Sequence, residues 1–230
     1  IPSQRSAILL LNRSILSSVA KVSGGEGIRI KPVGMHTKAE WTIQMSAIYS
    51  SLTRSNLTTA YLSNGTGGAF YTRISSTAGI QVKNGRDGDD TWTQIPLQAG
   101  KWLHITYVHK DKKTTVYVNG KVQKVFENSA ITFGENSMIV VGNSGYRNDY
   151  LREIRLWDKA LTESEINDYL YLPMDPATPH LISYLPLSKE METKDLKAPA
   201  GTENVTTKAR IEYVENVKFP ADELVIVNQE

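Results

Sequence analysis

The fold is decided by residues 100–126, which read GKWLHITYVHKDKKTTVYVNGKVQKVF. Successive residues from Trp102 to His109 fall on opposite faces of one strand, with Leu103, Ile105 and Tyr107 sharing the more apolar face. Asp111-Lys112-Lys113 turns the chain into a second strand. Asn119-Gly120 accepts positive φ at both positions, so a third strand folds back after it. The stretch therefore predicts an antiparallel meander.

The rest of the chain repeats this pattern of short alternating segments separated by glycine and asparagine turns. These segments are rich in Thr, Val, Ile and Tyr, which suit a half-buried pleat. Besides the meander, strands are predicted at 27–32, 41–49, 69–74, 80–83, 138–142, 151–157, 180–187, 208–217 and 224–227, with turns at 64–65 and 84–85. The pattern indicates an all-β sandwich of two antiparallel sheets.

One short helix interrupts the strands. Thr162 is a good N-cap, and Glu165 three positions later can reach back to its backbone amide. Leu161 before the cap can pack on Ile166, which completes a hydrophobic staple. Pro173 cannot continue a helix. The pattern predicts a capped helix that starts after Thr162 and ends before Pro173.

Composition narrows the classes of function. The chain has 230 residues, 26 Lys and Arg against 24 Asp and Glu, and no cysteine. A net charge of +2 lacks the basic excess of a nucleic-acid binder and suits a neutral ligand. The longest strictly apolar run, Ala7–Leu11, is far shorter than the roughly 18 residues of a membrane-spanning helix, so no spanning segment is expected. Without disulfides, burial between sheets must stabilise the domain.

Three linked motifs carry a family resemblance. Gly100–Val108 resembles the Gly-x-Trp-x-His-hydrophobic strand of the laminin G-like branch of the concanavalin A-like lectin/glucanase superfamily. Thr115–Lys121 resembles the hairpin Leu-Tyr-Val-Asn-Gly-Lys of that family, and Leu151–Ile166 resembles its closing strand and following helix. The resemblance covers about 19–187. It implies an all-β jelly-roll sandwich of two antiparallel sheets, with one short helix after the closing strand.

The resemblance also suggests a domain division. Residues 1–18 would be an N-terminal lead or a linker from a preceding domain, 19–187 the laminin G-like jelly roll, and 188–230 a C-terminal extension packing on the sandwich. The polar stretch 188–207 is predicted to be loop. The extension is similar to one that follows such domains in surface proteins of Gram-negative gut bacteria. Many members have Asp where Arg152 stands in the closing strand, so no metal or turn role is carried over to that position.

Catalysis is not expected. Glycan hydrolases of the superfamily carry Glu-x-Asp-x-Glu or Glu-x-Asp-x-x-Glu on one strand, and this sequence has neither spacing. Glu190 and Glu192 alternate, but they fall in a polar loop, where paired carboxylates are usually solvated. There is no cysteine nucleophile and no Gly-x-Ser-x-Gly elbow. The sequence therefore favours a binding module, with a hydrolase using unusual residues as the less favoured alternative.

Two clusters are candidates for calcium, which takes six to eight oxygen ligands and which laminin G-like domains often hold at the rim. One is the loop with Asp87, Asp89 and Asp90, and the other contains Asn143 and Asp149. The alternative interpretation, which we favour, is that both clusters simply form turns, since Asn, Asp and Gly are typical turn residues. No cofactor is required by the sequence, and calcium is the one candidate.

Glycan binding needs exposed aromatic rings beside hydrogen-bonding side chains. Trp102 and Trp157 occupy framework positions of the family, and Trp41 opens a strand. All three are expected in the core, as is His104. Trp92 instead follows the acidic loop and is the leading ligand-binding candidate. The other candidates are Tyr146, Arg147 and Tyr150, which are predicted to lie in a loop that shares the rim with Trp92.

The sequence thus predicts a non-catalytic recognition module of a bacterial surface protein, with a polysaccharide as the preferred ligand. The alternative is a protein-binding or adhesion module. The resemblance to domains of bacterial surface proteins implies an extracytoplasmic location, at the cell surface or outer membrane. The chain opens with Ile1-Pro2, without an initiator Met, so we expect the signal for this location to lie N-terminal to this sequence. Expected partners are a glycan or a surface protein, and no nucleic acid.

Overall fold

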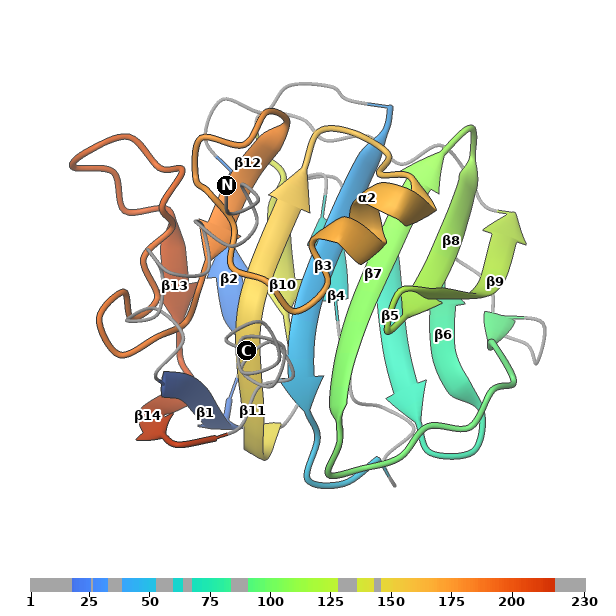
Figure 1. Cartoon of the computed structure of the whole chain (residues 1–230), viewed down its shortest axis with the longest axis horizontal. Coiled ribbons are helices and arrows are strands. Elements are labelled where there is room, and N and C mark those ends of the chain that lie inside the picture. Colours follow the sequence, from blue (N-terminus) through green and yellow to red (C-terminus); the bar gives the residue numbers. More distant parts are fainter. Residues whose placement is uncertain are drawn as a thin grey trace, which may run out of the picture.

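The computed structural model is a sandwich of two antiparallel sheets (Figure 1). The residues that it describes are 18–25, 27–32, 39–52, 60–63, 68–83, 91–127, 136–142 and 146–217. The predicted strand at 224–227 and the predicted turns at 64–65 and 84–85 lie outside these ranges. The expected all-β jelly-roll architecture is confirmed.

The larger sheet has eight strands. In spatial order they are β14 (Arg210–Glu215), β1 (Ser18–Gly24), β11 (Tyr146–Trp157), β3 (Trp41–Ile48), β7 (Trp102–Lys110), β8 (Lys113–Val118) and β9 (Lys121–Glu127), and β12 (Leu181–Leu185) also pairs with β11. β11 begins before the predicted strand, so Tyr146, Arg147 and Tyr150 lie on a strand rather than in a loop. Pairing with β1 from Tyr146 to Leu151 extends it.

The smaller sheet has six strands. Their order is β13 (Val205–Thr207), β2 (Ile28–Ile30), β10 (Met138–Val141), β4 (Ala60–Ser63), β5 (Gly68–Ser75) and β6 (Gly79–Lys83). β6 and β9 are therefore the terminal strands of the two sheets. They lie at the same side of the sandwich, on the right in Figure 1.

The predicted meander is confirmed. β7, β8 and β9 pair in sequence, and the turn between β8 and β9 has Asn119 at φ 51° and Gly120 at φ 76°. Leu103, Ile105 and Tyr107 point between the sheets, where they meet Phe70, Ile80 and other buried residues of the main core. Trp41 lies in this core, as expected. Trp102 does not. It is partly exposed and packs beside Leu172 on the outer face of the eight-stranded sheet.

A second hydrophobic cluster covers the outer face of the eight-stranded sheet. It lies under α2 (Glu163–Asp168) and includes Trp157, Leu161 and Ile166. The predicted cap is confirmed: the Thr162 hydroxyl accepts a 3.2 Å bond from the Glu165 amide, and the Glu165 carboxylate accepts one of 2.9 Å from the Thr162 amide. Leu161 and Ile166 are both buried, as the staple requires.

A buried ion pair fixes the connector that follows α2. Arg155 Nη2 donates to Glu153 Oε2 at 2.8 Å, and the same guanidinium donates to the backbone carbonyls of Tyr169 and Leu172. Tyr184 donates to Glu153 Oε1 at 3.1 Å. Burial, together with the nearby Glu153 carboxylate, raises the pKa of Tyr184 well above its ordinary value, so its hydroxyl remains a donor. All these charges are thus compensated under the connector.

The C-terminal extension contributes one strand to each sheet. β13 pairs with β2 and β14 pairs with β1, so the extension covers the same side of both sheets (Figure 1). Residues 188–207 were predicted to be loop, and the structure instead ends this stretch in a strand because Val205–Thr207 finds β2 as its pairing partner. α2, a helix of six residues, is too short to cross a membrane, and no other helix in the described ranges is a candidate span.

Candidate functional site

The outer face of β5 and β6 carries a compact cluster of polar and aromatic side chains. Tyr71 pairs with Lys83, and Arg73 pairs with Gln81. Trp92 forms an isolated bridge with Gln81. Directly opposed residues of an antiparallel pair project from the same face. These five residues therefore share one face, away from the core residues Phe70, Ile74 and Ile80, and we call them the β5–β6 face.

Trp92 is held in place through its backbone. The next residue, Thr93, donates from its amide to Ile80 O at 2.8 Å, and its hydroxyl accepts from the Ile80 amide at 3.0 Å. From the other sheet, Lys124 Nζ donates to Trp92 O at 2.7 Å. The segment can approach β6 so closely because Gly79 has no side chain: a Cβ there would lie 2.1 Å from Thr93 Oγ1. The partly exposed Trp92 ring thus stands on a fixed backbone.

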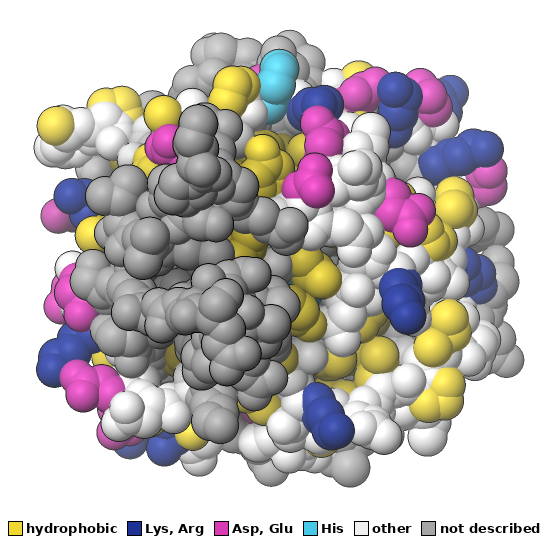
Figure 2. All heavy atoms as spheres, in the orientation of Figure 1, with side chains coloured by type: hydrophobic (Ala, Val, Ile, Leu, Met, Phe, Trp, Pro, Cys, Tyr) yellow, Lys and Arg dark blue, Asp and Glu magenta, His cyan; other side chains and the backbone are white. Residues whose placement is uncertain are grey.

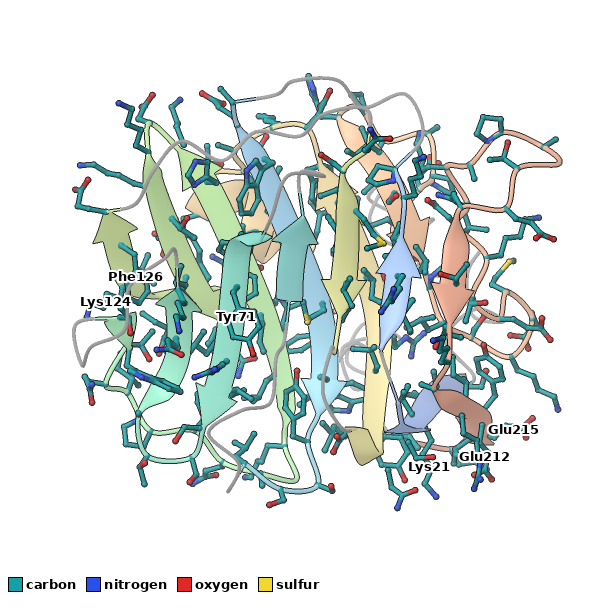
Figure 3. The ribbon with its side chains drawn as sticks, turned by 180° about the vertical axis from the view of Figure 1, so that it is seen from behind. Lys21, Tyr71, Lys124, Phe126, Glu212 and Glu215 are labelled. Carbon is teal, nitrogen blue, oxygen red and sulfur yellow. The ribbon has the colours of Figure 1, made fainter. Side chains whose placement is uncertain are left out.

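Tyr71 and Arg73 interact across one strand period of β5. The guanidinium carbon of Arg73 lies 5.1 Å from the centroid of the Tyr71 ring, and Arg73 Nε donates to the Tyr71 hydroxyl at 3.4 Å. A cation over an aromatic face restrains both groups. Both side chains are partly exposed. Figure 3 shows Tyr71 on β5, and it shows Lys124 and Phe126 on β9, the terminal strand of the eight-stranded sheet.

Gln81 lies at the centre of the β5–β6 face. Its amide nitrogen donates to Thr91 Oγ1 at 2.8 Å. Its amide oxygen is buried and finds no hydrogen-bond donor among the described residues. A buried acceptor without a donor is costly, so such a group is commonly satisfied by water or by a ligand. The oxygen is therefore an unsatisfied acceptor beneath this face.

The arrangement has the chemistry of a sugar site. Two aromatic rings can pack against the C–H faces of sugar rings, and the polar groups between them can bond to hydroxyls. Arg73 and Lys83 supply donors. No Asp or Glu belongs to the five residues of this face. The face can therefore bind and orient a polar ligand with a ring-shaped apolar surface.

The structure does not bring all the predicted ligand residues together. Trp92 lies on the outer face of the six-stranded sheet. Tyr150 alternates with the core residue Leu151 and so lies on the outer face of the eight-stranded sheet, on the opposite side of the sandwich. Tyr146 and Arg147 belong to the same strand as Tyr150 and pair with Gly24 and Ser23. The predicted common rim is therefore absent, because β11 runs in the middle of its sheet rather than ending near Trp92.

The calcium prediction falls mostly outside the described residues, which omit Asp87, Asp89, Asp90 and Asn143. Asp149 is 3% exposed on β11, and its Oδ1 accepts a 2.6 Å bond from the Ser50 amide. In the described ranges, no three His, Asp or Glu side chains cluster as metal ligands would. Calcium binding stays a prediction.

Sequence reasoning missed Tyr71, Arg73, Gln81 and Lys83. The signal for the first pair was present, because Phe70 and Ile74 are apolar while Tyr71 and Arg73 alternate with them. That alternation predicts a polar outer face for the strand. It does not predict that β6 lies beside it, nor that the segment around Trp92 adds to β6 through a single bridge.

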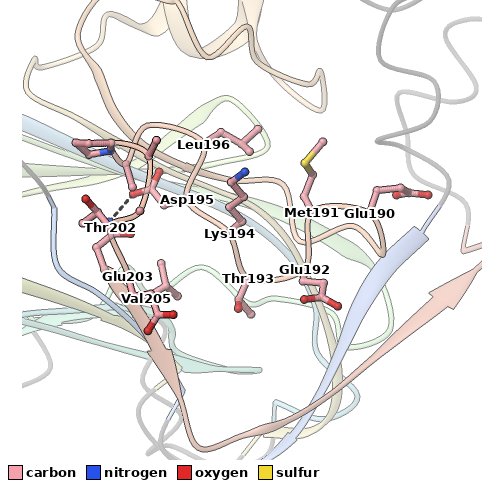
Figure 4. A pocket seen from close by; sticks show the side chains of 15 residues that line it. Glu190, Met191, Glu192, Thr193, Lys194, Asp195, Leu196, Thr202, Glu203 and Val205 are labelled. Atoms are coloured by element: carbon pink, nitrogen blue, oxygen red, sulfur yellow. Dashed lines mark hydrogen bonds between the residues drawn. The ribbon is translucent and has the colours of Figure 1, made fainter.

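A hollow lies within the C-terminal extension. Its volume is about 830 Å³, and residues of 190–205 line it (Figure 4). No aromatic residue belongs to the lining. Asp195 lies in its wall, where the carboxylate already accepts four bonds, among them one of 2.8 Å from Asn204. Glu190 and Glu192 are exposed loop residues, consistent with the solvated positions predicted for them.

The fold and this face define a lectin-like β sandwich, and the sequence places it in a family. A sequence model of the concanavalin A-like lectin/glucanases superfamily, of the laminin G type, matches residues 23–167, which is more than half of the chain. The chain belongs to this superfamily. No curated protein matches the sequence.

Solved structures agree with the fold. A protein from Bacteroides ovatus, whose carbohydrate binding is itself only proposed, has 20% identity and a TM-score of 0.67, and the match covers 88% of this chain and 61% of that one. A heptameric SAP-like pentraxin from Limulus polyphemus has 12% identity and a TM-score of 0.58, with 87% and 96% covered. Domain 4 of the GH43 extracellular arabinanase AbnA from Geobacillus stearothermophilus, in complex with arabinotriose, has 18% identity and a TM-score of 0.53, with 66% and 76% covered.

Proposed function

We propose that this chain is a carbohydrate-binding module without catalytic activity, and that the β5–β6 face is its binding site. The observation that carries the proposal is the placement of Tyr71 and Trp92 on one outer face, around the buried amide oxygen of Gln81. Stacking rings beside hydrogen-bonding groups are what sugar recognition requires.

The structural relatives support this function. One is a domain of an arabinanase bound to arabinotriose, and another is a protein for which carbohydrate binding has been proposed. Their identity to this chain is 18% and 20%, so they support the shared architecture, and the ligand site is argued from the residues above. We also propose that the module acts outside the cytoplasm of a bacterium, which fractionation of the producing cells would test.

The absence of catalysis is part of the proposal. Glycoside hydrolysis needs two carboxyl groups, about 5–5.5 Å apart for retention or about 6.5–9.5 Å apart for inversion. The β5–β6 face offers none among its five residues, and its strongest polar groups are cations and an amide. We expect no release of reducing sugar from any polysaccharide that the module binds.

Affinity electrophoresis against a panel of neutral and acidic polysaccharides tests the function. The wild type should be retarded by at least one polymer, and Trp92→Ala and Tyr71→Ala should each lose most of the retardation. Trp102→Ala is the matched control, since Trp102 is also partly exposed but lies on the outer face of the other sheet. If no polymer retards the wild type, the proposal of carbohydrate binding is wrong. Gels with EDTA or with added calcium test the metal prediction, and we expect no difference between them.

Protein binding is the second candidate function, and one observation favours it. Val122 and Val125 on the terminal strand β9 are 45% and 49% exposed. Exposed apolar side chains on a sheet edge can mark a protein contact. Beads coated with this module and added to cells treated with a protease or with glycosidases distinguish the two candidate functions. Attachment that is lost only after glycosidase treatment supports carbohydrate binding. Attachment that is lost only after protease treatment supports protein binding.

A further inference from the structure

The charged side chains within the strands of the six-stranded sheet are all basic. Its strands contain Arg29, Arg73 and Lys83 and not one Asp or Glu. These three cations alternate with core residues such as Ile28, Ile30 and Val82, so all project from the outer face of the sheet. The net charge of +2 for the whole chain does not reveal this distribution.

Arg73 is the most informative of these cations. It forms no ion pair with any residue in the described ranges, and its only polar partner there is the Tyr71 hydroxyl. Lysines elsewhere are neutralised by carboxylates, as in the pairs Lys110–Glu40 at 3.1 Å and Lys113–Glu127 at 3.0 Å. On the opposite face of the molecule, acidic and basic side chains lie together around α2 (Figure 2). Arg73 thus retains a positive charge without a carboxylate in the described protein.

The geometry matches an acidic sugar. Arg73 and Lys83 are diagonal neighbours on paired strands, which places their Cα atoms about 7–8 Å apart with Tyr71 and Gln81 at the other two corners. A guanidinium binds a carboxylate through two parallel hydrogen bonds. A sugar ring packed beside Tyr71 would present a ring carboxylate to Arg73.

We propose that the ligand of the β5–β6 face is an acidic polysaccharide whose sugars carry carboxylates, and that Arg73 is the residue that recognises them. The proposal rests on the carbohydrate-binding function proposed above. It goes further by naming the class of glycan, and it replaces the neutral ligand that the net charge suggested.

The experiment varies the charge of the glycan while its backbone stays the same. Polygalacturonate, alginate and hyaluronan are each compared with their methyl esters by isothermal titration calorimetry, because esterification removes the negative charge. We expect at least one acidic polymer to bind at least tenfold more tightly than its ester. Raising salt should weaken binding to the acid more than to the ester.

Variants assign the preference to Arg73. Arg73→Gln should weaken binding to the acid much more than binding to the ester, which brings the acid-over-ester ratio to near one. Lys113→Gln, on the other sheet, is the matched control and should keep the ratio. Melting temperatures of both variants confirm that they are folded.

Each outcome separates the two proposals. Equal binding of acid and ester, or binding of neutral polysaccharides alone, overturns the acidic ligand and leaves carbohydrate binding intact. Binding of no polysaccharide overturns both. Equal affinity for polyglutamate, a polyanion without sugar, shows recognition of charge alone and overturns the acidic-glycan proposal.

Discussion

The ammonium group of Lys124 on β9 donates a 2.7 Å hydrogen bond to the backbone carbonyl of Trp92, which bridges to Gln81 on β6. The bond therefore joins the terminal strands of the two sheets. The same ammonium lies 5.0 Å from the centroid of the buried Phe126 ring, so the lysine is anchored on the core. Lys124 and Gln81 thus hold the backbone of Trp92 from the two sheets.

Replacing Lys124 tests this support. Lys124→Met keeps an apolar stem of similar length and removes the donor, so the Trp92 backbone loses its hydrogen bond from the eight-stranded sheet. We expect glycan affinity to fall about three- to tenfold, as the loss of one hydrogen bond of about 1 kcal/mol would give. Calorimetry measures the change. Lys121→Met, at an exposed position of the same strand, should bind like the wild type, and equal affinity of both variants would contradict the supporting role.

The sequence predicted the sandwich because its signals are local. The alternation in β7, the Asn119-Gly120 turn and the Thr162 cap each involve residues close in the chain, and the structure confirms all three. The three family motifs fixed the same region. Such patterns depend on backbone geometry that neighbouring residues determine among themselves.

The binding face could be predicted only in part for the opposite reason. Trp92 was identified by its place after an acidic loop. Its neighbours on the face come from β5 and β6, and Lys124 contacts its backbone from β9. Strand pairing within the six-stranded sheet and a hydrogen bond from the other sheet bring these residues together. No local sequence pattern encodes either contact. Tyr150 was misplaced for a similar reason, because pairing with β1 draws its segment into the middle of a sheet.

Gly79 is required where the Trp92 segment meets β6. Its φ is +79°, and a Cβ would lie 2.1 Å from Thr93 Oγ1 and 2.4 Å from Ile95 O. Gly79→Ala should therefore cost about 1–2 kcal/mol for the left-handed backbone and about 1–3 kcal/mol more for the displaced segment, and glycan binding should weaken. Urea denaturation and calorimetry measure the two effects.

Gly100→Ala is the matched control for Gly79→Ala. Gly100 has φ +74°, and a Cβ there would meet nothing within 4 Å. The Gly100→Ala protein should be destabilised only by the left-handed backbone, and it should bind glycan like the wild type. Equal destabilisation by the two alanine variants would show that the Gly79 contact with Thr93 contributes nothing.

Asp195 joins the C-terminal extension to β12. Its buried carboxylate accepts bonds of 2.7 Å from Ser183 Oγ, 2.9 Å from the Tyr184 amide, 2.9 Å from the Lys197 amide and 2.8 Å from Asn204 Nδ2. Asp195→Ala leaves these donors without an acceptor, and we expect a loss of about 3 kcal/mol or more in the free energy of unfolding. Asp195→Asn keeps the shape and some of the acceptors, so it should be less harmful. Unchanged urea midpoints would contradict this role.

His104 makes stability depend on pH. Its side chain is fully buried, and burial, with a smaller effect of the nearby Arg155 charge, lowers the pKa of His104 from 6.5 to about 3. Its Nδ1 lies 3.4 Å from Thr106 Oγ1, and its ring packs edge-on to Tyr171. The unfolded chain therefore takes up a proton at this histidine below about pH 6.5, while the folded chain does so only near pH 3. The contribution of His104 is complete above pH 6.5 and is lost as the pH falls toward 3.

Comparison of the wild type with a His104 variant isolates this contribution. Between pH 7.5 and 4.5, His104 should account for about 2–3 kcal/mol of lost unfolding free energy, since each pKa unit corresponds to about 1.4 kcal/mol. Over the same interval, the His104→Gln protein should therefore lose about 2–3 kcal/mol less unfolding free energy than the wild type, whatever its stability at pH 7.5. Burial also lowers the pKa of His109, to about 4, but His109 is present in both proteins, so its effect cancels. Urea denaturation at the two pH values measures each slope, and a His104→Gln protein as acid-sensitive as the wild type would show that His104 is protonated in the folded state.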